Sequence, residues 1–93
     1  MLGTVKKQPN EVIDVDVSFD TFLPTLDEIV SIESFPDDPS LVIPFTDIVD
    51  NNRTVKVWLQ EGTDGIDYKV TVRIHTSGGR VVEAEFKVKL KET

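Results

Sequence analysis

The segment that most constrains the fold runs from Asp64 to Leu90 and places two alternating sequences on either side of a glycine turn. Apolar side chains recur at every second position of residues 68–74 and again of residues 82–90. A period of two is typical of half-buried β-strands. The segment therefore predicts an antiparallel hairpin that packs one face on a core and exposes the other.

The loop of this hairpin follows from the requirement that both apolar sets share one face. Opposed residues of an antiparallel pair point to the same side of the sheet, so Thr76 is expected opposite Arg80. This register leaves a three-residue loop of Ser77, Gly78 and Gly79, and the left-handed position falls on Gly79. Gly78 and Gly79 are thus predicted to be structural residues.

The rest of the chain divides into short segments of the same kind. Alternation predicts strands at residues 12–19 and 54–61. Residues 26–35 fit a short helix or a strand, and their β-branched content together with the proline-rich stop behind them favours a strand. Residues 41–43 and 45–49 are further short candidates. About six to seven antiparallel strands and no strong helical period predict an all-β, immunoglobulin-like sandwich.

A chain of 93 residues is expected to form one domain. Residues 1–10 contain few apolar groups and are predicted to be an N-terminal arm, followed by the sandwich domain at residues 11–93. The start lacks the apolar stretch of a secretory signal, so a cytoplasmic start is the default expectation. The apolar runs are too short to cross a bilayer.

Charge and cysteine content narrow the function classes. The net charge of −7 argues against a nucleic-acid binder, which needs a basic stripe. The imbalance is uneven, with eleven acidic residues against three basic ones in residues 1–53 and six against seven in residues 54–93. The absence of cysteine excludes disulfides and thiolate metal sites.

Catalytic candidates are few. Asp14 and Asp16 share the predicted outer face of a strand, where water relieves their repulsion. His75 is the single histidine and is expected at the surface, and Ser77 lies outside any strand-turn-helix elbow. A strand rather than a helix follows the two glycines, so they do not form a phosphate-binding loop. The sequence predicts no enzyme activity, no cofactor and no metal.

Tyr68 has a spacing that bears on the fold class. Asp64 precedes it by four residues and Val70 follows it by two, which resembles the tyrosine corner of immunoglobulin-like domains with valine in place of cysteine. In such a corner the Tyr68 hydroxyl bonds a backbone group a few residues upstream. The alternative is an ordinary half-buried aromatic side chain.

Trp58 is expected on the outer face of its strand. A tryptophan there is either a binding hot spot or is covered within the molecule by the proline-rich segment 36–44. Phe22 and Leu23, which precede Pro24 in a predicted loop, are likewise either interface residues or covered within the molecule. The candidate protein-interface residues are Trp58, Lys56, Gln60, Phe22 and Leu23.

Several stretches resemble one family. They are the lead Lys7-Gln8-Pro9-Asn10-Glu11, the corner Phe22-Leu23-Pro24, the run from Val55 to Gly65, and Tyr68-Lys69-Val70-Thr71-Val72 with Thr76-Ser77-Gly78-Gly79-Arg80. Together they resemble the small fibre-tail adaptors of tailed phages and prophages. Residues 27–52 do not contribute to this resemblance.

The resemblance implies an immunoglobulin-like virion protein that joins tail and fibre proteins, is oligomeric in the particle and is made in the bacterial host cytoplasm. It implies no nucleic-acid, membrane or small-molecule partner. The alternative is an immunoglobulin-like adhesion or carbohydrate-binding module of a bacterial surface protein.

Overall fold

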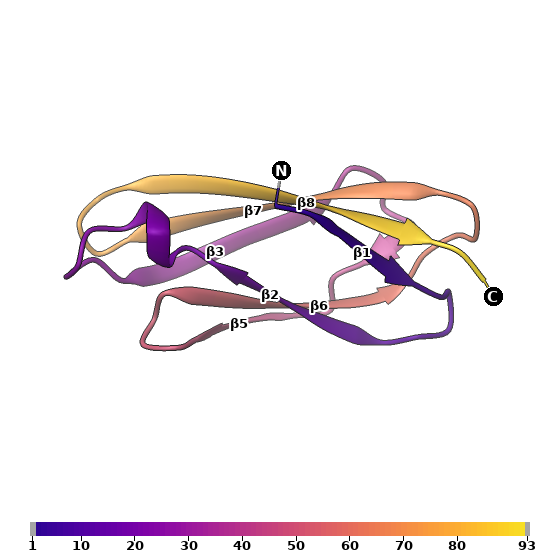
Figure 1. Ribbon diagram of the computed structural model, residues 1–93, viewed down its shortest axis with the longest axis horizontal. Helices are drawn as coiled ribbons and strands as arrows, with labels where there is room; N and C mark the ends of the chain where they lie inside the picture. The colour runs from indigo at the N-terminus through magenta and orange to yellow at the C-terminus, as the bar shows by residue number, and fades with distance from the viewer. Residues whose placement is uncertain (1, 93) are drawn as a thin grey trace.

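The computed structural model describes residues 2–92, and within them eight strands form two facing sheets (Figure 1). The strands are β1 (Thr4–Lys7), β2 (Ile13–Ser18), β3 (Ile29–Pro36), β4 (Leu41–Val42), β5 (Thr46–Val49), β6 (Thr54–Glu61), β7 (Asp67–Thr76) and β8 (Val81–Leu90), with one 3-10 turn, η1 (Asp20–Phe22). One sheet has the order β1-β8-β7-β3, and the other has the order β2-β6-β4 with β5 also paired to β6. No helix in this part of the chain is long and apolar enough to cross a membrane.

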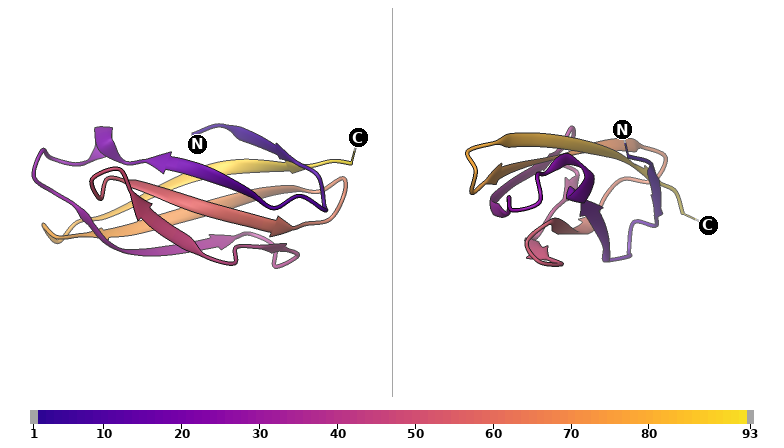
Figure 2. Two further views of the ribbon diagram at one scale, coloured as in Figure 1. Left: turned by 90° about the horizontal axis from the view of Figure 1, so that it is seen from below. Right: turned by 60° about the vertical axis from the view of Figure 1, so that its left-hand side comes forward.

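This topology confirms the predicted all-β, immunoglobulin-like sandwich. β3, β7 and β8 take the places of the C, F and G strands, and β2, β6 and β5 take those of the B, E and D strands. The sandwich is elongated, with extents of 43 × 19 × 19 Å. Figure 1 shows the two sheets as separate layers along this length, and the right-hand view of Figure 2 shows the layers turned partly end-on.

The hairpin between β7 and β8 has the predicted register. His75 lies opposite Val81, and the N–H of Thr76 donates to the carbonyl of Arg80 over 2.9 Å. Gly79 has a φ of 85°, in the left-handed region that favours glycine. The turn therefore lies where the sequence predicts it, because only this pairing buries both apolar sets.

The core lies between the sheets and comes from alternate positions of the long strands. The inward side chains of β6 and β7 are almost completely buried: Val55, Val57, Leu59, Tyr68, Val70, Val72 and Ile74. β6 is the central strand of the second sheet, because β2, β4 and β5 all pair with it. Residues 26–35 form the predicted strand, although β3 begins only at Ile29.

The N-terminal segment differs from the expectation of an unpaired arm. Thr4–Lys7 form β1, which runs parallel to β8 and makes an eighth strand. The side chain of Lys7 is buried, and its ammonium donates to the carbonyls of Glu61 (2.6 Å) and Gln8 (2.9 Å). A buried lysine gives no apolar signal, so the sequence pattern could not predict this strand. The division of the chain into an arm at residues 1–10 and a sandwich domain at residues 11–93 stays a prediction.

Tyr68 forms the bond that its spacing predicts. Its side chain is buried, and its hydroxyl accepts the backbone N–H of Thr63 over 2.9 Å. The hydroxyl also bonds the Ser40 side chain, which ties the β6–β7 corner to the turn before β4. Asp64 is exposed and accepts the N–H of Glu92 instead. The corner is therefore closed by Tyr68, with Ser40 as a partner that the sequence did not indicate.

Candidate interaction surfaces

One end of the sandwich presents a loop that Arg53 holds in place. The loop connects β2 to β3, and the guanidinium donates to the carbonyls of Asp20, Leu23, Pro24 and Asp27 over 2.8–2.9 Å. The same group pairs with the carboxylate of Asp20. A planar guanidinium can satisfy this many acceptors because its five N–H groups have fixed directions. The loop is thus fixed from within by one side chain.

Asp27 fastens this loop to the tip of the β7–β8 hairpin. Its carboxylate accepts the N–H of Gly78 at 2.8 Å, the hydroxyl of Ser77 at 3.1 Å and the guanidinium of Arg80 at 3.1 Å. Burial alone would raise the pKa of this carboxyl, but hydrogen bonds from Thr76, Gly78 and neighbouring donors outweigh it and lower the pKa to about 2. Asp27 is therefore ionised at neutral pH.

Gly78 is needed because the backbone comes so close to this carboxylate. A Cβ at Gly78 would lie 3.0 Å from Oδ1 of Asp27 and 2.6 Å from the Arg80 guanidinium. Glycine is therefore required at the two loop positions for different reasons. Gly79 adopts the left-handed conformation of the turn, and Gly78 leaves space for the contact between Asp27 and Arg80.

Phe22 and Leu23 separate in the structure. Leu23 is buried in the core, so it offers almost no exposed surface for the interface role that was predicted for it. Phe22 is half-exposed and lies with its ring 6.1 Å from that of Phe19. Leu26 in the same loop is 91% exposed, which leaves it as the most prominent apolar side chain at this end. The alternation of the sequence could not rank these residues, because the loop has no period.

Trp58 lies on the outer face of β6 with Lys56 and Gln60, as expected, and is half-buried. Its ring packs on Phe45, with 5.3 Å between the ring centroids. Phe45 follows the proline-rich segment and is itself 56% exposed. The pair forms an aromatic patch that is covered on one side and open to solvent on the other. Phe45 was not among the predicted interface residues.

Carboxylates surround Lys56 beside this patch. Asp14 and Asp16 of β2 each lie 3.0 Å from its ammonium, and Asp47 of β5 stands opposite it in the register. The hydrogen bonds that the Lys56 ammonium donates to Asp14 and Asp16 raise the pKa of Lys56. The repulsion between the two aspartates is therefore relieved by the ammonium of Lys56. We call Asp14, Asp16, Asp47, Phe45 and Trp58 the acidic-aromatic face.

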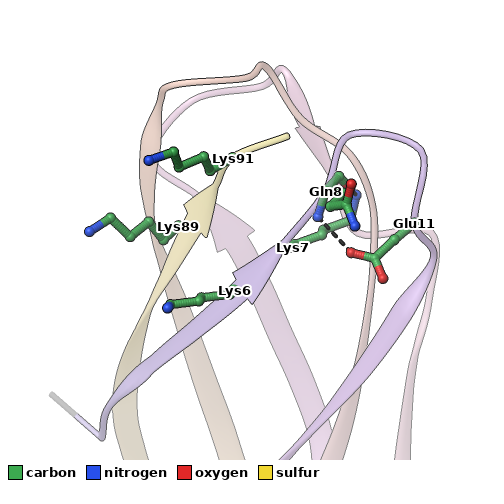
Figure 3. Close-up of a pocket in the computed structure, with 6 residues that line it drawn as sticks. All are labelled: Lys6, Lys7, Gln8, Glu11, Lys89 and Lys91. Atoms are coloured by element: carbon green, nitrogen blue, oxygen red, sulfur yellow. Dashed lines mark hydrogen bonds between the residues drawn. The ribbon is translucent and has the colours of Figure 1, made fainter. Parts of the chain in front are cut away.

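A cluster of lysines occupies the outer face of the other sheet, near the end of β8. Figure 3 shows Lys6, Lys89 and Lys91 with their ammonium groups pointing the same way, while Lys7 turns towards Gln8. These side chains line a concavity of about 400 Å³. Lys87 lies two residues before Lys89 on the same strand and is exposed. We call Lys6, Lys87, Lys89 and Lys91 the lysine patch.

Catalytic groups do not gather in the part of the chain that the structure describes. Residues 2–92 contain no group of three His, Asp or Glu side chains close enough to hold a metal ion. His75 is at the surface and bonds Glu33 over 2.7 Å, and this bond together with nearby Arg73 lowers the pKa of Glu33. Asp37 and Asp38 act as turn acceptors, for Lys69 and Ser40 respectively.

Four features were missed by the sequence reasoning: Arg53, Asp27, Phe45 and the lysine patch. The alternation Lys87, Lys89, Lys91 was a usable signal, because a period of two places all three side chains on one face of a strand. Arg53 and Asp27 gave no local signal. Apart from the N–H of Glu28, which donates to Asp27, the partners of these two side chains lie 26 or more residues away in the chain.

The fold and these surfaces define a small immunoglobulin-like domain whose distinctive groups lie on its exterior. The chain matches, over residues 7–89, the family described as podophage GP4 fiber-tail adaptor protein gp77. It belongs to this family, and the predicted resemblance is confirmed. The family is one of phage tail adaptors and so of virion-associated structural proteins. No curated protein matches the chain.

Proposed function

We propose that this protein is a non-enzymatic adaptor that joins tail and fibre components of a podophage or prophage particle through protein-protein contacts. The observation that carries the proposal is the family match over residues 7–89, which spans every strand except the beginning of β1 and the last residue of β8. The exterior supports it, because a joint needs binding surfaces rather than a cleft. The protein is synthesised in the host cytoplasm and is oligomeric in the particle.

The acidic-aromatic face is one proposed protein-protein contact within the particle. Trp58 and Phe45 offer rigid apolar area, and Lys56 and Gln60 flank them on the same strand face. Aromatic anchors ringed by polar groups are typical of binding hot spots. The loop that Arg53 holds is the second proposed contact, through Phe22 and Leu26, since a rigid loop loses little entropy on binding.

Immunogold labelling of purified particles tests the proposal. Label concentrated on the tail supports the adaptor function. Protein present in the lysate but absent from purified particles would contradict it and would favour an assembly factor or a host-directed binding module.

A matched pair of variants then separates the contacts in particles. Trp58→Ala is expected to weaken partner binding by about 2 kcal/mol or more while the domain stays folded. Leu26→Ala tests the loop in the same assay. If neither variant changes incorporation into particles, both proposed contacts are wrong.

A further inference from the structure

Two opposite faces of the sandwich carry complementary chemistry. The lysine patch lies on the outer face of the β1-β8-β7-β3 sheet, and the acidic-aromatic face lies on the outer face of the β2-β6-β5 strands. We infer that the lysine patch of one copy binds the acidic-aromatic face of a second copy. The inference deepens the proposed function, on which it rests for the presence of several copies in one particle.

The first support is the unfavourable placement of the lysines within the sheet. Lys6 lies directly opposite Lys89, and Lys69 lies directly opposite Lys87. Like charges in directly opposed positions destabilise a sheet. Lys69 has Glu85 at 3.3 Å, whereas the four patch lysines form no ion pair within residues 2–92, although Asp67 stands opposite Lys89. The folded domain alone gives no reason for this concentration of charge.

A row farther along the same sheet shows the usual arrangement. Arg73 lies directly opposite Glu83 on one side and Glu33 on the other, and its guanidinium pairs with them at 2.6 and 3.7 Å. The charges of that row are balanced within the domain. The lysine patch differs from that row, because none of its four lysines forms an ion pair within residues 2–92, although Asp67 lies opposite Lys89 and Glu11 lines the same concavity.

The second support is the matching excess of negative charge on the other face. Lys56 is the one ammonium among Asp14, Asp16 and Asp47 in the described structure. Lysines of another copy can approach the remaining carboxylate oxygens and lay their aliphatic stems on the Phe45–Trp58 pair. The lysine patch of one copy thus supplies positive charge to the carboxylates of the acidic-aromatic face of the next copy.

The geometry fixes the kind of assembly. The two surfaces are different and point away from each other, so the contact is heterologous and leaves one free surface of each kind on every pair. Such a contact builds rings or open stacks rather than closed two-fold dimers.

Charge exchange between the two faces tests this contact. Lys89→Glu/Lys91→Glu changes the patch alone, and Asp14→Lys/Asp47→Lys changes the face alone. Analytical ultracentrifugation is expected to show multimers for the wild type, monomers for each variant alone, and multimers again when the variants are mixed at equal concentration. Circular dichroism of each variant checks that the domain is folded.

A milder pair controls for net charge. Lys89→Gln/Lys91→Gln and Thr21→Glu/Thr25→Glu lower the net charge equally, but only the first touches the patch, since Thr21 and Thr25 are exposed in the loop at the other end. The first pair is expected to raise the dissociation constant of self-association at least about tenfold and the second to change it little. Equal effects would overturn the inference.

Two further outcomes would contradict the self-contact and can be told apart from failure of the adaptor function. A wild type that stays monomeric up to about 1 mM would overturn the self-contact, while tail labelling in particles would leave the adaptor function standing. Binding of a double-stranded DNA fragment that Lys89→Gln/Lys91→Gln abolishes, without self-association, would replace a second copy with nucleic acid as the partner.

Discussion

The two ends of the sandwich are closed by different chemistry. At the hairpin end, the guanidinium of Arg53 and the carboxylate of Asp27 hold the loop between β2 and β3. At the opposite end, the neutral hydroxyl of Tyr68 and the ammonium of Lys7 bind mainly backbone groups. Charged hydrogen bonds stabilise more than neutral ones but depend on ionisation. The difference teaches that the hairpin end depends directly on an ionised, buried carboxylate, whereas the bonds of Tyr68 and Lys7 at the opposite end do not require one.

The largest effect is expected from Arg53→Ala. Four carbonyls and one carboxylate lose their donor, and unsatisfied backbone groups are costly, so the free energy of unfolding should fall by about 3 kcal/mol. Chemical denaturation measures it. Arg53→Lys is the control, because it keeps the charge without the planar fork and should recover only part of the loss. A loss near zero would show that the loop is held by its packing instead.

Asp27→Asn should have the next largest effect at neutral pH, because the amide keeps an accepting oxygen but loses the charge that Arg80 faces. The pKa of Asp27 in the folded protein, about 2, is below the ordinary value of 3.8. Its stabilisation is therefore complete above about pH 4 and disappears as the pH falls towards 2. The difference between wild type and variant, measured by thermal unfolding, should shrink over that interval. A constant difference would mean that ionisation of Asp27 does not contribute.

Tyr68→Phe should cost about 1.5 kcal/mol, since the N–H of Thr63 loses its acceptor and the Ser40 hydroxyl, which also donates to Asp38, loses one of its two partners. Unlike the Asp27→Asn difference, this one should vary little between pH 2 and 6, because a phenol stays protonated there and the nearby carboxylate of Asp38 bonds Ser40 rather than Tyr68. Ser40→Ala removes one of the two bonds and should cost less. Parallel pH series of both variants sharpen the contrast between the two ends.

The smallest loss of stability is expected from Trp58→Ala, about 1 kcal/mol, because the ring is half-buried against Phe45 on the outer face of β6. Phe45→Ala should cost about as much, since each ring covers the other. A loss above about 3 kcal/mol for Trp58→Ala would show that Trp58 belongs to the core. The middle of the sheet would then contribute to stability as much as the two ends do.

The sequence by itself determined the strands whose side chains alternate. β6 begins and ends where the pattern predicts, and the β7–β8 hairpin has the predicted loop, because burial of one face leaves a period of two in the chain. The spacing around Tyr68 also predicted the corner, because the hydrogen bond that closes it joins residues only five positions apart. Information of this kind is local, so a single sequence contains it.

Only the tertiary structure decided β1, the loop between β2 and β3, and the matching of the two faces. Lys7, Arg53 and Asp27 act through partners 54, 26 and 53 residues away, and their side chains are polar, so no period marks them. The unequal charge of the two halves of the chain was visible in the sequence. Its distribution over two opposite faces follows from strand pairing, which brings Lys6 beside Lys89 and Asp47 beside Lys56.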